Sequence, residues 1–262
     1  MSLYVYCLGD ELSAEWFGDL RGVGGAPVRV LAAGALAAAV SEFGGEAAEV
    51  SAENVRAHNR VNAAALARTT PLPFRFGTLA AASALADYVS ANEAALLDAL
   101  ARVRGCVEMS VKVRWEAEKA KVKRQKAIEE GGEAEGRLDA AAGEGAGSEL
   151  PGGARGHTPG AGSGTAFLLA RRREILGDEA LRRRAEGVAA WLASRVSELV
   201  RESAARTSPS EALVVRAAHL VERARLGEYR ARVRALSGER ADLHFLASGP
   251  WPPYSFSEIR RE

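Results

Sequence analysis

The sequence has few cysteines and no long apolar run, and each shortage excludes a class of protein. Only Cys7 and Cys106 are present among 262 residues, with no CxxC pair, so a disulfide framework is not expected. Both lie in apolar, strand-like runs, where a free thiol behaves as a small buried hydrophobe. No segment approaches the ~18 apolar residues of a membrane span, and the first residues lack the basic start of a signal peptide. The expected location is the cytoplasm.

Net charge is also nearly absent. The formal charge is +1 at pH 7, so no field of the whole molecule attracts it to nucleic acid or to a lipid surface. We therefore expect no nucleic-acid partner and no membrane partner. The apolar fraction of 47% and the charged fraction of 26% are those of an ordinary globular protein, and the length allows one or two domains.

The first part of the chain, residues 1–115, mixes strands with helices. Its patterns predict, in order, a strand at 3–8, a hairpin at 28–40, a helix at 51–67, two helices within 79–104 and a strand at 106–115. The last strand alternates most clearly, with Val107, Met109 and Val111 facing one way. We interpret residues 1–115 as a ferredoxin-like domain of the α+β class, with helices packed on one face of its sheet.

The composition changes after Trp115. Residues 116–130 are charged and predicted to be helical, and residues 131–164 are dominated by Gly, Ala and Glu. Such a segment cannot bury enough apolar surface to offset its ordering entropy, so 116–164 is predicted to be a flexible linker. Residues 165–262 then give helix, strand, helix and strand, which indicates a smaller α+β domain.

A search for catalytic chemistry finds none. The four histidines do not pair at metal-ligand spacing, and His58 fits a helix's apolar face. The segment "GAGSGTA" lacks the lysine of a phosphate-binding loop, and no serine fits a nucleophile elbow. The sequence therefore predicts no catalytic residue, no metal site and no cofactor.

Two segments are dense in proline and aromatic residues. "PLPFRFGT" contains Phe74, Arg75, Phe76 and Gly77; the residues favour an edge strand or bend whose phenylalanines fill the core, with a binding ridge as the alternative. "GPWPPYSF" has a composition that suits a docked chain end. We expect its aromatic rings to lock this tail onto the C-terminal domain, and a partner surface is the alternative. Its candidate residues are Gly249, Pro250, Trp251, Pro252, Pro253, Tyr254 and Phe256.

These segments carry a resemblance. "LYVYCL" at the start, "LPFRFGT" in the middle, "GTAFLLARRR" and the closing "GPWPPYSF" resemble, in this order, landmarks of the gas vesicle GvpL/GvpF family. The resemblance implies a two-domain α+β protein with a ferredoxin-like N-terminal domain. It also implies a non-catalytic, accessory or minor structural role in building gas vesicles. The implied partners are the small hydrophobic shell protein and other vesicle proteins.

Two other classes stay open from the residues alone. A nucleic-acid-binding ferredoxin-like module would need its arginine clusters on one face, although the stacking aromatics of an RNA-binding sheet are missing. An enzyme would need distant residues, for example His58, Arg75 and Glu108, to converge in one cleft.

Overall fold

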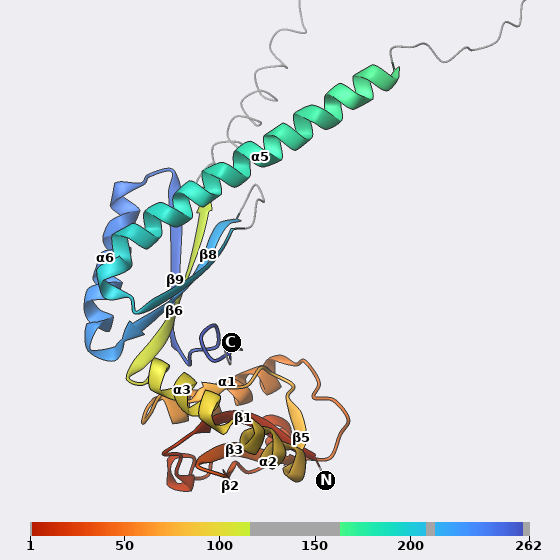
Figure 1. Ribbon diagram of the computed structural model, residues 1–262, viewed down its shortest axis with the longest axis vertical. Coiled ribbons are helices and arrows are strands. Elements are labelled where there is room, and N and C mark those ends of the chain that lie inside the picture. Colours follow the sequence, from red (N-terminus) through yellow and green to blue (C-terminus); the bar gives the residue numbers. More distant parts are fainter. Residues whose placement is uncertain (1, 116–162, 208–212, 259–262) are drawn as a thin grey trace, which may run out of the picture.

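The protein is built around two antiparallel sheets, one above the other in Figure 1. The structure is a computed structural model that describes residues 2–115, 163–207 and 213–258. The predicted linker therefore lies outside the described residues, apart from its last two positions. Those two begin helix α5, Ser163–Val196, which starts two residues before the predicted boundary at residue 165.

The first sheet has the strand order β2-β3-β1-β4, with β5 also paired to β1. Its hairpin and its first helix follow the sequence pattern. Ser51 caps α1 by accepting a hydrogen bond from the N–H of Asn54, and Gly34 makes the hairpin turn with a φ of 58°. The elements are β1 (Ser2–Gly9), β2 (Arg29–Ala33), β3 (Leu36–Phe43), α1 (Ala52–Leu66), β4 (Leu72–Pro73), β5 (Leu79–Ala81), α2 (Ala82–Ala91) and α3 (Glu93–Val103).

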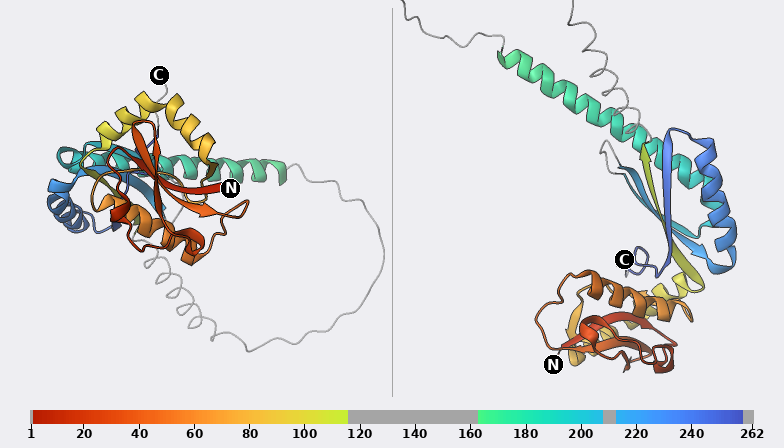
Figure 2. Two further views of the ribbon diagram at one scale, coloured as in Figure 1. Left: turned by 90° about the horizontal axis from the view of Figure 1, so that it is seen from below. Right: turned by 180° about the vertical axis from the view of Figure 1, so that it is seen from behind.

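Helices cover both faces of this first sheet, which corrects the expectation of one covered face. The register of β1 shifts between Val5 and Cys7, so Tyr4, Tyr6 and Cys7 pack with α1 while Val5 and Leu8 pack with α2 and α3. The left view of Figure 2 shows the strands between these two groups of helices. Because helices cover both faces of this sheet, the side chains on both faces of β1 are buried, which explains its continuous apolar run.

The second sheet contains β6, Cys106–Trp115, at its centre, in the order β7-β8-β6-β9. The sequence analysis placed this strand in the domain of residues 1–115, but it pairs with β8 and β9. Alternation shows that one face of a strand is buried and does not show which sheet it joins. The remaining elements are β7 (Glu202–Thr207), β8 (Leu213–Glu222), α6 (Leu226–Glu239), β9 (Leu243–Trp251) and the 3-10 turns η3 (Ser197–Leu199) and η4 (Arg223–Arg225).

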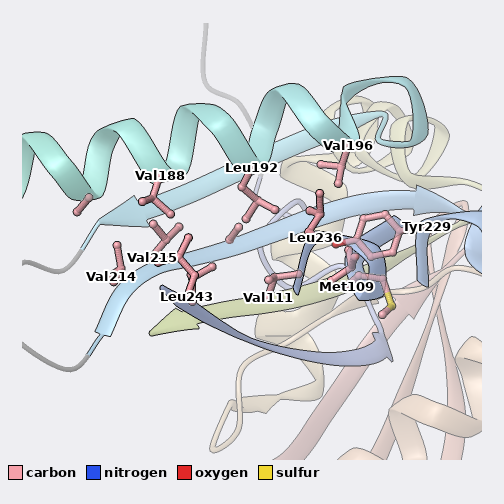
Figure 3. Packing of buried hydrophobic residues seen from close by; sticks show 14 of the residues in the cluster. Met109, Val111, Val188, Leu192, Val196, Val214, Val215, Tyr229, Leu236 and Leu243 are labelled. Carbon is pink, nitrogen blue, oxygen red and sulfur yellow. The ribbon is translucent and has the colours of Figure 1, made fainter. Parts of the chain in front are cut away.

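From β6 onward the described elements run β6, α5, β7, β8, α6 and β9, which is the ferredoxin-like sequence of elements. Both helices lie on one face, where they cover Met109, Val111 and Val215 (Figure 3). The first sheet has the same order of strands, but two 3-10 turns, η1 (Ala14–Trp16) and η2 (Val23–Gly25), stand where its first helix would be. The α+β fold is thus confirmed, and the ferredoxin-like strand order occurs twice.

Arginines join the two sheets at the start of β6. Arg223 donates to the carbonyl oxygens of Leu66 and Thr69, at 2.6 and 2.7 Å, so it caps the C-terminal end of α1. Arg201 donates to the carbonyl oxygens of Arg102 and Arg104, at 3.0 and 3.2 Å, at the end of α3. Both arginines belong to the second sheet's half, so these bonds fix one half against the other.

Candidate functional site

The C-terminal tail, residues 252–258, leaves β9 and packs against the first half of the protein (Figure 1). Phe256 is 5% exposed and joins the apolar cluster made by β1, β3, α2 and α3, together with Cys106 and Leu220. The expectation that the tail locks onto its own C-terminal domain is therefore wrong for Phe256, although Ser255 is bonded to Glu108 of β6. A phenylalanine predicts burial, but the sequence does not name the surface that buries it.

Trp251 is not an anchor of the tail, contrary to expectation. Its ring is 40% exposed, and its indole N–H donates to the Ser248 hydroxyl at 3.3 Å. Pro252 and Pro253 are buried, whereas Pro250 is exposed at the end of β9. Gly249 has a φ of 123°, and a Cβ there would lie 2.8 Å from the Glu108 carbonyl oxygen, so only glycine fits.

Polar groups from elsewhere in the chain hold the tail in place. The Glu108 carboxylate accepts two hydrogen bonds from Ser255, from its N–H at 2.7 Å and from its hydroxyl at 3.0 Å. Burial raises the pKa of Glu108, and the two bonds from Ser255 oppose this shift. Arg102 donates to the carbonyl oxygen of Phe256, and Arg75 forms an exposed ion pair with Glu258 at 3.2 Å.

His58 contacts the tail from α1. Its Nε2 is hydrogen bonded to the Tyr254 hydroxyl at 3.1 Å, and its Nδ1 to the Tyr4 hydroxyl at 3.0 Å. Burial lowers the pKa of His58 to about 4, so the imidazole is neutral at pH 7. It thus acts as a neutral hydrogen-bonding link between a core tyrosine and a tail tyrosine.

His58, Arg75 and Glu108, the residues on which the enzyme alternative depended, do surround one segment of the chain. That segment is the tail, and each of the three is bonded to a tail residue. The hollow that Arg75 and Glu108 both line does not include His58. These three side chains hold the tail in place, because each of them is bonded to a tail residue.

The FRFG segment interrupts an edge of the first sheet. β4 and β5 pair with successive parts of β1, and residues 74–78 loop out between them. Phe76 packs inward, edge-on to Tyr4 and His58 with ring centroids 6.0 and 5.7 Å apart. Gly77 has a φ of 87° and donates its N–H to the Tyr4 hydroxyl at 2.9 Å, while Arg75 points to solvent.

A groove of about 610 Å³ lies between this edge, helices α2 and α3, and the tail. Phe74 is half-buried on one wall, edge-on to Tyr88 of α2 at a centroid distance of 6.4 Å. Tyr88 is 40% exposed. The apolar lining is Leu8, Leu72, Pro73, Phe74, Tyr88 and Leu96. Arg75, Asn92 and Glu258 are polar lining residues of the same groove.

The structure thus brings part of the two predicted segments together. Phe74, Arg75 and Tyr254 line the groove. Phe256 packs in the cluster that contains Leu72 and Leu96, whereas Phe76 packs on the α1 side of the sheet. Tyr88 and Leu96 were missed by sequence reasoning, because on an amphipathic helix they read as ordinary core positions. Their place in the groove depends on where residues 72–78 and the tail lie, which no local pattern contains.

Two searches of the described residues bear on other kinds of site. Among them, no group of three or more His, Cys, Asp or Glu side chains is placed to hold a metal ion. None of the described helices combines the length and the hydropathy that a membrane span requires.

The protein thus has two sheets of ferredoxin-like strand order. Its C-terminal tail packs against the first half and forms one wall of a groove. The family model of the gas vesicle synthesis protein GvpL/GvpF matches residues 2–258, and the chain belongs to this family. The resemblance seen in the sequence is confirmed, and the family associates the chain with gas vesicles.

Solved structures agree with this assignment in fold. The gas vesicle protein GvpF from Anabaena sp. PCC7120 is similar with a TM-score of 0.70 at 18% identity, over 99% of each chain. GvpF from Microcystis aeruginosa is similar with a TM-score of 0.68 at 18% identity, over 98% of this chain and 99% of the other. No curated protein matches the sequence.

Proposed function

We propose that this protein is a non-catalytic accessory factor of gas vesicle assembly that covers an apolar segment of the small shell protein. The proposal depends on one observation. Two segments that are 180 residues apart in the chain, around Phe74 and around Tyr254, contribute to one groove whose lining is about half apolar. Other vesicle proteins are further candidate partners of the same surface.

The physical need for such a factor follows from the shell itself. Subunits that assemble into a gas-filled wall must present apolar surface before they are incorporated, and exposed apolar surface aggregates. A protein that covers this surface, and releases it at the growing shell, keeps the subunit available.

The groove has the features of a segment-binding surface. Leu8, Leu72 and Leu96 line it, and Phe74 and Tyr88 add two aromatic rings. Charged and amide groups of Arg75, Asn92 and Glu258 also line it. An apolar wall with polar groups beside it suits an amphipathic helix, whose apolar side enters the groove while its polar side stays in water.

Co-purification of the full-length chain with the shell protein tests the proposal. We expect Tyr88→Ser to weaken retention at least tenfold, since an aromatic at the centre of an interface commonly contributes about 2 kcal/mol. Val50→Ser is the matched control, because Val50 is 81% exposed and lies outside the groove. Cells that carry Tyr88→Ser should also lose floating vesicles.

Two outcomes would contradict the groove as the binding surface. One is retention of the shell protein by Tyr88→Ser at the wild-type level. The other is an equal loss in Tyr88→Ser and Val50→Ser, which would indicate a general effect of removing surface apolar groups. Urea unfolding of both variants separates lost binding from lost folding.

A further inference from the structure

The second sheet has one face that no described helix covers. α5 and α6 pack on the side of Met109, Val111 and Val113 (Figure 3). Ser110 and Lys112 of β6 point to the opposite face of the sheet, away from these helices. The residues paired with them on the neighbouring strands point the same way. This outer face begins at the tail, where Glu108 holds Ser255, and continues along the strands away from the first sheet.

A row of cations crosses this outer face. Arg206 of β7 is opposite Arg216 of β8, and Arg216 is opposite Lys112 of β6. We call these three residues the basic row. All three are exposed, and directly opposed residues on neighbouring strands have Cβ atoms about 5 Å apart. Arg114 lies two residues further along β6, on the same face.

Among the described residues, the basic row lacks the ion pairs that some other arginines of the second half form. Other arginines of the second half are paired within the protein, for example Arg195 with Glu239 at 3.1 Å and Arg201 with Glu222 at 2.9 Å. Within the described part of the chain, no ion pair involves any member of the basic row. Like charges directly opposite each other destabilise a sheet, so this arrangement costs stability until an anion binds.

A hollow of about 380 Å³ lies beside the row, between it and the tail. Small residues of three strands, Ser110, Ala204 and Ala218, line it. Arg206 and Arg216 line it as well, and Glu108 and Glu258 line it towards the tail. A sheet surface with such short side chains lets another element approach the backbone closely, with the guanidinium groups beside it.

The spacing of the row indicates which element fits. Neighbouring strands are about 4.8 Å apart, so the three cations repeat at about this distance across the sheet. Residues at i and i+4, or i and i+3, of an α-helix are about 5–6 Å apart along one face. A helix that crosses the strands can therefore present successive carboxylates to successive members of the row.

We propose that the outer face of the second sheet binds an acidic helix of a partner protein, with carboxylates at i, i+4 spacing against Lys112, Arg206 and Arg216. Guanidinium and carboxylate groups match in shape as well as charge. Single-stranded RNA is disfavoured as the occupant, because ferredoxin-like sheets that bind RNA stack bases on aromatic side chains of the central strands. Here the central outward positions near the row are Ser110 and Ala218. The proposal is independent of the groove.

Fluorescence anisotropy with the full-length protein tests this surface. The probe is a labelled, alanine-based 18-residue peptide with glutamates at three i, i+4 positions, and its matched control carries glutamines there. We expect the glutamate peptide to bind the wild type and to dissociate as salt rises. The triple variant Lys112→Gln, Arg206→Gln, Arg216→Gln should bind it about tenfold more weakly, as expected for three exposed ion pairs.

The matched control protein is Arg56→Gln, Arg60→Gln, Arg183→Gln, which removes three exposed cations elsewhere and should bind like the wild type. The basic-row variant should be at least as stable as the wild type in urea, since it relieves like-charge repulsion. The proposal is overturned if the glutamate and glutamine peptides bind equally, or if both triple variants lose binding equally. Tighter, row-dependent binding of an oligouridine than of the peptide would also overturn it and assign the face to nucleic acid.

Discussion

Replacing Phe256 by alanine measures how strongly the tail ties the two halves of the protein. The ring is 5% exposed and sits in the cluster formed by side chains of the first sheet and of α2 and α3. A buried phenylalanine removes about 200 Å² from water, which at about 25 cal/mol per Å² corresponds to at most about 5 kcal/mol. Alanine keeps part of this burial, so we expect a loss of about 3 kcal/mol in the free energy of unfolding.

The position of Phe256 near the chain end sets an upper limit to this loss. A variant whose tail no longer docks can release it and keep both sheets, so the loss cannot exceed the free energy with which the tail is held. The two hydrogen bonds from Ser255 to Glu108 contribute to the same docking. Release of the tail should therefore be visible separately, as faster proteolytic cleavage after Tyr254 in the native state.

Urea unfolding of Phe256→Ala and Trp251→Ala, side by side, is the assay. Trp251 is larger but 40% exposed, so it removes about 150 Å² from water, and on the same scale its substitution should cost less than that of Phe256, about 2 kcal/mol. A loss for Trp251→Ala equal to or greater than that for Phe256→Ala would refute the assignment of the anchor. So would a Phe256→Ala protein with an unchanged midpoint.

Two further substitutions test the junction of the halves and the buried histidines. Arg223→Ala should lower the free energy of unfolding in urea by about 2 kcal/mol, because the carbonyl oxygens of Leu66 and Thr69 lose their donor. Arg223→Lys keeps the charge but not the planar guanidinium group, so it should recover only part of this loss. Burial lowers the pKa of His219 to about 4, against about 6.5 in an unfolded chain, so the unfolded state binds more protons as the pH falls from 6.5 towards 4. The free energy of unfolding should therefore fall by about 1–2 kcal/mol between pH 7 and 5 because of this group. His219→Gln should remove that part of the dependence of the free energy of unfolding on pH. An unchanged dependence in the variant would mean that the imidazole is already charged in the fold.

Local patterns were enough to predict most of the elements. The alternation of residues 106–115 gives β6 with both ends correct, and Ser51 marks the start of α1. Two helices were expected within 79–104, and α2 and α3 meet there at Asn92. These features depend on neighbours within one or two turns, which a single sequence contains.

What the sequence could not supply is the pairing of distant parts. β7 was not predicted as a strand, because its exposed residues Ala204 and Ala205 have no strand pattern and are held by pairing with β8. The basic row arises only when β6, β7 and β8 are aligned, since each strand contributes one member to it. The tail was identified correctly as a docked element, but its docking partner lies in the other half of the chain.

The tail links the two surfaces proposed here, because it is a wall of both. Arg75, Tyr254 and Glu258 line the groove on one side of the tail and also the hollow next to the basic row on the other. The tail is held by Phe256 and by hydrogen bonds to His58 and Glu108, so its position is fixed as long as these contacts remain. A ligand that shifts the tail on one side must change the shape of the other side, which couples the two surfaces through a single segment. If so, Phe256→Ala should weaken the capture of the shell protein and of the acidic helix together, whereas Tyr88→Ser and the basic-row variant should each weaken only one.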